Sequence, residues 1–541
     1  MIFYGRRKLH LVSLVVLALI VALVPSTILA QGRPLALTTR GPVSGLVTPA
    51  GIHAFLGIPY AAPPVGNLRW RPPVPHEHWF APLDATQFGN HCPQLPTPVG
   101  RATLSEDCLF LNIFTPGDDE RDGDHDFDLF RHRRPVMVWI HGGALVTGES
   151  DDYDPTALVQ DGVIVVTINY RLGALGFLAH PAFAAESSDP DHDRDTDANS
   201  AGNYGLMEQQ AALRWVRDNI FFFGGDPFNV TIFGQSAGGL SVLSQLVSPS
   251  AGGLFHKAII ESGAYNLNTE SLAAAEAAGI AFAAAAGCAN QTAACLRALP
   301  VTTILANENT AGYTPNLDVE FLPLSVGTAL ATGQFHHVPV IQGSNHDEWR
   351  FFTATGFDLL GHPIANTEAG YEAALATLVG PAARLVAAQY PLASFPSADL
   401  AYAAAGTDVV FACPALAADL SMSQFVPLSA YEFNDESAPE DFLPPVTFPY
   451  DAAHGSELQY LFAFLHTPFT LPQQKLSATM QHYWTSFAKF GSPNSATTPF
   501  WQPFNPLQLN FQSLVPPTPA AETNFAIFHH CAFWGQLLGA Q

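Results

Sequence analysis

The residues with the clearest chemical meaning form a short serine-centred segment, GQSAG, at 234–238. A β-branched run, 230–233 (VTIF), precedes it, and a helical stretch, 240–247, follows it. On a strand-to-helix turn, flanking glycines leave room for a strained elbow that exposes the serine hydroxyl above a sheet. The N-terminus of the helix also presents backbone N–H groups that favour developing negative charge. This context predicts that Ser236 is a nucleophile.

A second segment suited to chemistry is the loop HGGA at 141–144, which follows another strand-like run, 136–140 (VMVWI). Serine hydrolases with such an elbow place here the loop whose N–H groups bind the substrate oxygen. Glycine lets the backbone approach that oxygen, and each donor contributes roughly 2.7–4 kcal/mol to stabilisation of the transition state. We therefore expect this loop to form part of an oxyanion hole.

A serine hydroxyl needs a base, and the base needs a carboxylate that orients it. In the fold that carries a serine elbow, the chain order is Ser, then Asp or Glu, then His. After Ser236, the strand-like run 338–341 leads into GSNHDE at 343–348. This loop offers two adjacent acids, Asp347 and Glu348, and the pattern alone does not choose between them.

Several histidines follow the two acids and could serve as the base. His454 lies in a polar turn, 451–455, ahead of an apolar helix, whereas His466 and His482 lie in aromatic-rich segments typical of packed structure. A catalytic imidazole must be reachable by the serine and by substrate. His454 is therefore the leading candidate for the base.

The elements that must position these residues alternate along the chain from residue 135 onward. Short apolar runs typical of buried strands occur at 136–140, 163–168, 230–233, 258–260 and 338–341. Helical patterns lie between and after them, as at 206–219, 272–287 and 478–490. Strands buried on both faces and separated by helices predict an α/β fold with a large, mostly parallel sheet flanked by helices. The Pro- and Gly-rich segment before residue 135 predicts a small antiparallel lead-in.

Composition excludes several classes of protein. The 541 residues include 22 basic and 47 acidic ones, for a net charge of −25, while 48% are hydrophobic. So much apolar material excludes global disorder, and the negative charge argues against nucleic-acid binding. Thirteen of the acids fall in 118–128 and 186–197, which we expect to be solvated surface insertions. The spaced aspartates of the second segment lack the glycine and closing glutamate of a calcium loop, so no metal is expected.

The N-terminus has the features of an export signal. Three basic residues at 6–8 precede an apolar run of about 14 residues, shorter than the ~20 needed to span a bilayer. We interpret 1–30 as a signal peptide, with an uncleaved anchor as the alternative. By this length criterion we expect no other stretch to be apolar for long enough to span a bilayer, so no stable membrane span is expected after cleavage. Without a flexible linker or repeat, 31–541 is expected to form a single domain.

The six cysteines are even in number, which in an exported chain predicts three disulfides, with buried free thiols as the alternative. Their spacing lacks the paired pattern of a zinc site. Six cysteines allow 15 pairings, so the sequence pattern leaves the connectivity open.

Taken together, these segments resemble the type-B carboxylesterases, a family of α/β-hydrolases that includes carboxylesterases, cholinesterases and several extracellular lipases. The resemblance covers nearly all of the chain after residue 30. Beyond the segments already described, it rests on GIPYAAPPVGNLRWRPP (57–73), SEDCLFLNIFTP (105–116), NYRLGALGF (169–177), the long run 202–239, DAAHGSEL (451–458) and CAFW (531–534).

The resemblance implies roles for individual residues. Ser236 would be the nucleophile, Glu348 rather than Asp347 the acid, and His454 the base. Gly143, Ala144 and Ala237 would supply the oxyanion N–H groups, with Gly142 shaping the loop. The implied disulfides are Cys92–Cys108, Cys288–Cys295 and Cys413–Cys531, and Arg69 would form an ion pair with Glu106.

Three departures from the family pattern bear on the substrate. Ala144 stands where many members have a third glycine, and Gln235 replaces the glutamate common before the nucleophile. The segment between Cys92 and Cys108 contains no Trp, the residue with which cholinesterases hold a quaternary ammonium by cation–π attraction. Choline esters are therefore not expected as substrates.

The sequence thus predicts a secreted or periplasmic serine carboxylesterase that cleaves small-molecule esters through an acyl-enzyme, without a metal or cofactor. One alternative is a lipase acting on longer acylglycerols, which would need a mobile lid. Another is a non-catalytic adhesion protein on the same scaffold, although such relatives typically lose the nucleophile that this chain retains.

Overall fold

The computed structural model describes residues 32–117, 133–187, 201–309, 312–463 and 467–539. The proposed signal peptide (1–30), the acidic segment 118–128 and all but the first two residues of 186–197 lie outside the described residues, as does His466. The expectations for these segments therefore stay predictions.

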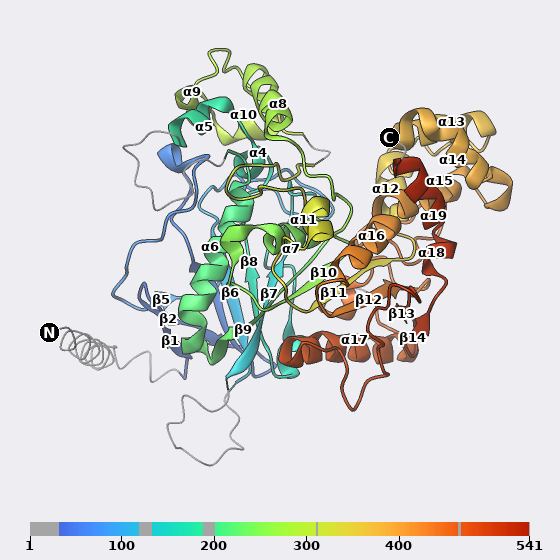
Figure 1. Ribbon diagram of the computed structural model, residues 1–541. Coiled ribbons are helices and arrows are strands. Elements are labelled where there is room, and N and C mark those ends of the chain that lie inside the picture. Colours follow the sequence, from blue (N-terminus) through green and yellow to red (C-terminus); the bar gives the residue numbers. More distant parts are fainter. Residues whose placement is uncertain (1–31, 118–132, 188–200, 310–311, 464–466, 540–541) are drawn as a thin grey trace.

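An 11-stranded sheet forms the centre of the molecule (Figure 1). The strands run in the order β14-β13-β12-β11-β10-β9-β7-β8-β6-β4-β3. Those from β8 to β13 pair in parallel, while the remaining pairs, at the two edges, are antiparallel. The strands are β3 (Leu46–Val47), β4 (His53–Pro59), β6 (Phe110–Thr115), β7 (Arg134–Ile140), β8 (Ile164–Ile168), β9 (Gly225–Gln235), β10 (Lys257–Glu261), β11 (Val340–Asn345), β12 (Leu428–Phe433), β13 (Phe511–Leu514) and β14 (Ala520–Glu522). The predicted mostly parallel sheet is confirmed.

The lead-in is a separate three-stranded sheet of β1 (Leu35–Leu37), β2 (Pro42–Ser44) and β5 (Leu83–Asp84). β1 and β2 pair antiparallel as expected, but β2 and β5 pair in parallel. A long segment connects β2 to β5, so that β5 can run in the same direction as β2. A hairpin connection could only make the two strands antiparallel.

Helices cover both faces of the large sheet because its central strands are apolar on both sides. In β7, Val136 and Val138 belong to one buried cluster, and Met137 and Trp139 belong to another. The first cluster includes side chains of α6 (Tyr204–Asn219) and α7 (Ala237–Val247). The second includes side chains of α17 (Leu471–Phe490) and α3 (Thr156–Gln160). The sheet is therefore the middle of three layers (Figure 1).

A third buried cluster lies among helices from the later part of the chain, near the described C-terminal end (Figure 1). It includes side chains of α13 (Glu368–Val379), α14 (Ala383–Gln389), α15 (Ala398–Gly406) and α19 (Cys531–Gly539). The other α-helices are α4 (Gly173–Phe177), α5 (Pro181–Ser187), α8 (Leu272–Ala285), α9 (Ala293–Arg297), α10 (Val301–Ala306), α11 (Val326–Thr332), α12 (Trp349–Thr353), α16 (Cys413–Met422) and α18 (Phe525–Phe528).

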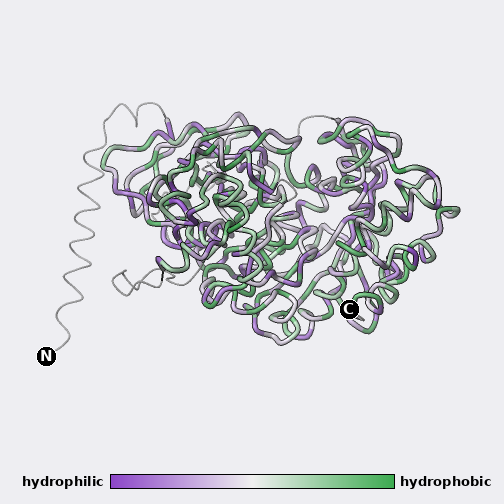
Figure 2. Tube along the Cα trace, turned by 90° about the horizontal axis from the view of Figure 1, so that it is seen from above, coloured by the Kyte–Doolittle hydropathy of each residue, from purple (hydrophilic) through white to green (hydrophobic). Residues whose placement is uncertain are grey.

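Hydrophobic and hydrophilic stretches alternate along the trace throughout the molecule (Figure 2). Among the described residues, one continuous helical stretch, Ala398–Met422, is nevertheless long and apolar enough to cross a membrane by length and composition. This corrects the expectation that no stretch beyond the N-terminus meets that test. Its most apolar part is 61% buried within the fold, and a core helix of a soluble protein passes the same test.

The structure contains three disulfides, Cys92–Cys108, Cys288–Cys295 and Cys413–Cys531, which is the pairing that the family resemblance implied. Arg69 and Glu106 form the expected ion pair, with 2.5 Å between Nη2 and Oε1. Structural disulfides persist in oxidising compartments and are rare in the cytosol. They therefore indicate a non-cytosolic location.

A buried histidine joins the C-terminal segment to the sheet. His529 is 1% exposed; its Nδ1 lies 2.5 Å from Oδ1 of Asp408, and its Nε2 lies 2.5 Å from Oε1 of Glu432. Burial alone would lower the pKa of this imidazole, but the two carboxylates outweigh burial and raise it to about 10. We therefore expect His529 to be protonated at neutral pH, and its backbone carbonyl lies 3.2 Å from Sγ of Cys413 in the Cys413–Cys531 disulfide.

This clamp of His529 between two carboxylates predicts a loss of stability at alkaline pH. Because the folded pKa of His529 lies above its ordinary value of 6.5, its contribution is complete below pH 6.5 and is lost as the pH rises through about 10. Because the folded state binds this proton more tightly than the unfolded state, we expect the free energy of unfolding to fall by a few kcal/mol across that window. An imidazole signal of His529 that titrates near pH 6.5 in NMR spectra would contradict the clamp.

Candidate active site

The serine elbow forms where β9 passes into α7. β9 ends at Gln235, and Ser236 occupies the N-cap of α7 with φ 56° and ψ −123°. A left-handed non-glycine residue costs about 1–3 kcal/mol, so the surrounding packing must hold it in place. Glycine is required next to it: a Cβ at Gly238 would lie 2.0 Å from the carbonyl oxygen of Ile140. The predicted strand, elbow and helix around Ser236 are thus all present.

The carboxylate beside His454 is Glu348, which follows β11 by three residues. Oε2 of Glu348 lies 2.5 Å from Nδ1 of His454. Its other oxygen, Oε1, accepts hydrogen bonds from the Ser262 hydroxyl at 2.5 Å and from the Asn345 N–H at 2.8 Å. Glu348 is fully buried and His454 is 7% exposed. A buried carboxylate in this position holds the imidazole in one orientation and one tautomer.

Asp347, the alternative acid, has different partners. Its carboxylate lies 3.2 Å from Nδ1 of His346 and 2.7 Å from Nη2 of Arg350. Burial by itself would raise the pKa of Asp347, but these two neighbours outweigh it and hold the pKa below the ordinary value. The tertiary structure therefore distinguishes Glu348, which contacts His454, from Asp347, which does not; the sequence pattern could not make this distinction.

The alternative histidine His482 lies away from the elbow. It is on α17, and its Nδ1 lies 2.5 Å from Asp161. His454 instead lines the same cavity as Ser236.

The second ring nitrogen of His454 meets Gln235 rather than Ser236. Nε2 of His454 lies 3.3 Å from the side-chain nitrogen of Gln235. With Nδ1–H donating to Glu348, Nε2 is the acceptor of this contact. Among the described residues, no hydrogen bond joins Ser236 to His454. Catalytic hydrogen bonds are often long in unliganded sites and shorten only when substrate binds.

Gly142, Gly143 and Ala144, in the loop after β7, line the same cavity as Ser236. The carbonyl of Gly142 faces Nδ1 of His141 at 2.9 Å, and the carbonyl of Gly143 accepts from the N–H groups of Val146 and Thr147, each at 3.0 Å. In a trans peptide the N–H points opposite to the C=O. The N–H groups of Gly143 and Ala144 are therefore directed away from these partners.

His141 is held so that it can bind the Gly142 carbonyl. Its ring stacks on Tyr170 with 4.5 Å between centroids, and the Tyr170 hydroxyl donates to the His141 carbonyl at 2.6 Å. Burial lowers the pKa of His141 to about 4, so the ring is neutral at neutral pH. Sequence reasoning identified the loop but not this supporting role of His141.

A further acid lies behind the Glu348–His454 pair. Glu457 accepts a hydrogen bond from the Asn345 amide, whose nitrogen also donates to the Ala453 carbonyl at 2.8 Å. Burial, followed by the nearby charge of Glu348, raises the pKa of Glu457 to about 7. Asn345 thus ties the end of β11 to the segment that carries His454. Sequence reasoning missed Ser262 because no local pattern marks it, whereas Asn345 and Glu457 lie in the segments 343–348 and 451–458 but were not singled out there.

Ser236 and His454 both line a cavity of about 720 Å³. Ser236, His454, Gln235 and the loop 142–144 form one part of its wall. The rest of the wall combines aromatic and aliphatic side chains with threonines and the carboxylates of Asp151, Asp152 and Asp441. The aromatic lining residues are Tyr153, Phe351, Phe352 and Phe442. A partly apolar cavity with a few convergent polar groups is the usual form of a small-molecule site.

The described residues contain one group with the composition of a metal site, formed by His91, Glu149 and Asp151. Arg101 already donates to both carboxylates, with Nε of Arg101 2.5 Å from Glu149 and Nη2 2.5 Å from Asp151. This group is thus accounted for as an ion-pair network beside the cavity, and no catalytic step is assigned to it.

The α/β-hydrolase class is defined by a sheet of mostly parallel strands between two helical layers, with a strained serine between a strand and a helix. Residues 33–534 match the model of the Carboxylesterase family, so the chain belongs to that family. Para-nitrobenzyl esterase of Bacillus subtilis (strain 168) is 36% identical over 489 residues, covering 85% of this chain and 90% of the relative. Pyrethroid hydrolase Ces2e of Rattus norvegicus is 35% identical over 506 residues, covering 86% and 84%.

The three-dimensional comparison agrees with the sequence comparison. A solved structure of a PNB esterase superposes with a TM-score of 0.73 at 33% identity, covering 91% of this chain and 97% of that one. Acylcarnitine hydrolase of Mus musculus is a further relative, 34% identical over 507 residues that cover 87% of this chain and 86% of the relative. The protein is therefore a carboxylic ester hydrolase.

Proposed function

We propose that this protein is an exported serine carboxylesterase in which Ser236, His454 and Glu348 are the catalytic triad. The observation that carries the assignment is the 2.5 Å contact between Nδ1 of His454 and buried Glu348, at a cavity that Ser236 also lines. Such a pair leaves Nε2 as the only basic position of the ring, and Nε2 lies 3.3 Å from the side-chain nitrogen of Gln235, the residue before Ser236. The proposed substrates are small-molecule carboxylic esters.

In the proposed reaction, Oγ of Ser236 attacks the ester carbonyl carbon while its proton moves to Nε2 of His454. The carbonyl electron pair moves onto oxygen, where the N–H groups of Gly143, Ala144 and Ala237 would stabilise the negative charge. When the C=O re-forms, the alcohol leaves with the proton from His454, and an acyl-enzyme remains. Water then repeats the same steps and releases the acid. Besides the ester and water, the groups that take part in the scheme are side chains and backbone N–H groups of this chain.

Export through removal of 1–30 and a single catalytic domain over 31–541 complete the proposal. The three disulfides support export because their formation needs an oxidising compartment. The basic and apolar pattern of 1–30 supports a cleaved signal. N-terminal sequencing of the mature protein tests this part directly; a protein that retains residues 1–30 would contradict it.

The cavity predicts a preference for short and medium acyl chains. A volume of about 720 Å³ with an aromatic lining can bury part of such a chain, whereas a long chain must extend outside it. Across p-nitrophenyl esters, kcat/KM is expected to rise from acetate to about hexanoate, by roughly fourfold per buried CH₂ at most, and to fall for palmitate. A pre-steady-state burst of p-nitrophenol should accompany turnover. A steady rise up to palmitate, with activation at an emulsion surface, would instead identify a lipase.

A further inference from the structure

The turn that carries the proposed oxyanion donors is strained. Gly143 has φ 102°, and two non-glycine residues follow it in the left-handed region, Ala144 at φ 54° and Leu145 at φ 60°. Each of the latter costs about 1–3 kcal/mol and persists only when its surroundings determine the conformation. Something outside the turn must therefore hold it.

The support is visible at the C-terminal end of the turn. Thr147 donates its N–H to the Gly143 carbonyl at 3.0 Å, which sets the plane of the peptide that carries the Ala144 N–H. The Thr147 hydroxyl in turn donates to Oε1 of Gln94 at 2.6 Å. The same oxygen accepts from the N–H of Gly148 at 2.8 Å, and Nε2 of Gln94 donates to the Gly148 carbonyl at 3.1 Å. One buried side chain thus binds two consecutive residues that end the turn.

Gln94 is carried by the loop that the Cys92–Cys108 disulfide closes. Gln94 is 1% exposed, and its backbone N–H and C=O pair with Thr103 across the loop at 3.1 and 3.2 Å. At Gly100 the loop packs directly on the turn, since a Cβ there would lie 2.0 Å from the Thr147 hydroxyl. The loop therefore presents Gln94 from a closed, internally paired frame.

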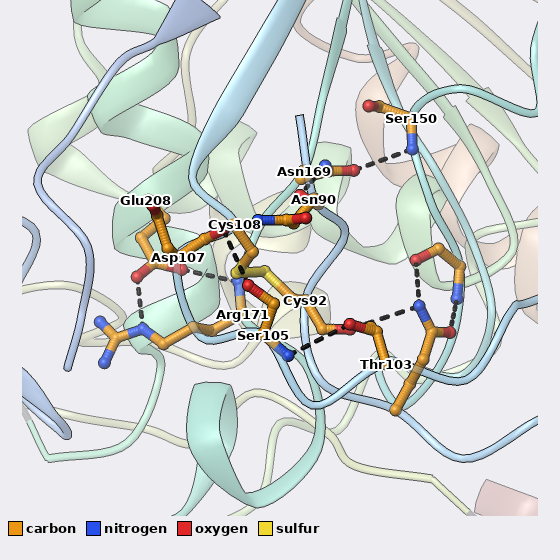
Figure 3. The surroundings of a disulfide bond; sticks show 12 residues. Asn90, Cys92, Thr103, Ser105, Asp107, Cys108, Ser150, Asn169, Arg171 and Glu208 are labelled. Atoms are coloured by element: carbon orange, nitrogen blue, oxygen red, sulfur yellow. Dashed lines mark hydrogen bonds and ion pairs between the residues drawn. A yellow bond between two sulfur atoms is a disulfide. The ribbon is translucent and has the colours of Figure 1, made fainter. Parts of the chain in front are cut away.

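A second bridge joins the same two segments. Asn169 donates from its side-chain nitrogen to the Asn90 carbonyl at 3.1 Å and accepts from the Ser150 N–H at 2.8 Å. Figure 3 shows Asn169 between Asn90, next to the disulfide, and Ser150. The chain on either side of Gly148 is thus fixed to the base of the disulfide loop at one point and to Gln94 at the other.

We propose that Gln94 is a positioning residue for the oxyanion hole, which holds the strained 143–147 turn so that the N–H groups of Gly143 and Ala144 point into the cavity. This inference rests on the proposed function. The Cys92–Cys108 loop would then contribute to catalysis indirectly. The disulfide holds Gln94 in position, and Gln94 holds the N–H groups of Gly143 and Ala144 in position. A displacement of about 1 Å in such groups can lower a rate by about 100-fold.

The test is Gln94→Leu, which keeps the approximate size of the side chain and removes its three contacts with Thr147 and Gly148. We expect kcat for p-nitrophenyl butyrate to fall by about 10- to 100-fold while KM changes by less than about threefold, because donor position matters most once the oxyanion forms. Affinity for a trifluoromethyl ketone, to which Ser236 adds to give an oxyanion, should fall by a similar factor. Affinity for the matched methyl ketone should stay nearly constant.

Gln473→Leu is the matched control. Gln473 is 4% exposed; its Oε1 accepts from the N–H and hydroxyl of Thr470 at 3.0 and 2.8 Å, and its Nε2 donates to the Ser437 carbonyl at 3.0 Å. Its Nε2 also donates to Oδ2 of Asp435 at 2.9 Å, so Gln473 makes at least as many side-chain hydrogen bonds at the start of α17 as Gln94 makes to Thr147 and Gly148. We expect Gln473→Leu to lower the melting temperature and to leave the ratio of the two ketone affinities unchanged.

The inference is overturned if Gln94→Leu lowers kcat no more than Gln473→Leu, or if the two ketones lose affinity equally. If Gln94→Leu does not fold, Thr147→Val serves instead, and Thr147→Ser, which keeps the hydroxyl, should restore the ketone ratio. The proposed function fails separately, through an active Ser236→Ala protein. An inactive Ser236→Ala protein beside an unaffected Gln94→Leu protein rejects the inference alone.

Discussion

Ser236→Ala is expected to lower kcat for p-nitrophenyl butyrate by about 10⁴- to 10⁶-fold, the range found when the nucleophile of a serine hydrolase is removed. The elbow places Oγ at the N-terminus of α7 and in the wall of the cavity, and its removal leaves His454 with no hydroxyl to activate. The pre-steady-state burst should disappear as well, because no acyl-enzyme can form. Binding of the methyl ketone should persist, since the cavity is unchanged.

Ser244→Ala is the control for this experiment. Ser244 is fully buried on the same helix, and its hydroxyl donates to the Leu240 carbonyl at 2.8 Å, so the substitution removes the same atom without touching the cavity lining. Its kcat should stay within about threefold of the parent protein. Hydrolysis by Ser236→Ala at more than about one hundredth of the parental rate would remove Ser236 from the mechanism.

Glu348→Gln is expected to lower kcat by about 10³- to 10⁴-fold with little change in fold. Both oxygens of Glu348 accept hydrogen bonds, Oε2 from His454 and Oε1 from Ser262 and Asn345. An amide has only one carbonyl oxygen. If the amide nitrogen faces His454, it favours the wrong tautomer of the ring; if it faces the other side, it meets the N–H of Asn345. Either arrangement leaves Nε2 a poorer base.

Asp347→Asn makes the same chemical change at the neighbouring residue. Asp347 pairs with His346 and Arg350, so its loss is expected to reduce thermal stability while kcat stays within about fivefold of the parent. Comparable losses of kcat in the two variants, at equal folded fraction, would contradict the assignment of the acid to Glu348. Steady-state kinetics and a melting curve for each variant are sufficient.

Much of the fold followed from local pattern. The β-branched run 230–233, the glycines around Ser236 and the helical stretch after it predict one structural unit, and the structure contains that unit as β9, the elbow and α7. These features are readable because burial on both faces selects apolar strands, and a strained turn selects glycine. The small lead-in sheet was predicted to be antiparallel, but β2 and β5 pair in parallel. Their relative direction depends on the path of the long segment that connects them, which local pattern does not determine.

Local sequence pattern predicted the candidate site except for the choice of acid between two adjacent residues. Asp347 and Glu348 have the same chemistry and differ by one position, so local pattern could not rank them; the family resemblance could. The structure places them by the direction in which the chain leaves β11, which turns Glu348 toward His454 and Asp347 toward Arg350. Ser262 and Gln94 had no signal at all, since a lone serine or glutamine is as common in loops as in supporting networks.

The sequence by itself determined the class of fold and the family, and it supplied the candidate residues for ester hydrolysis, because each of these depends on residue type and order along the chain. Tertiary structure alone decided which groups meet: Gln235 at Nε2 of His454, Tyr170 at the His141 carbonyl, and Gln94 at the end of the 143–147 turn. The physical reason is that hydrogen bonds require particular distances and angles. Those are set by the packing of segments far apart in the chain.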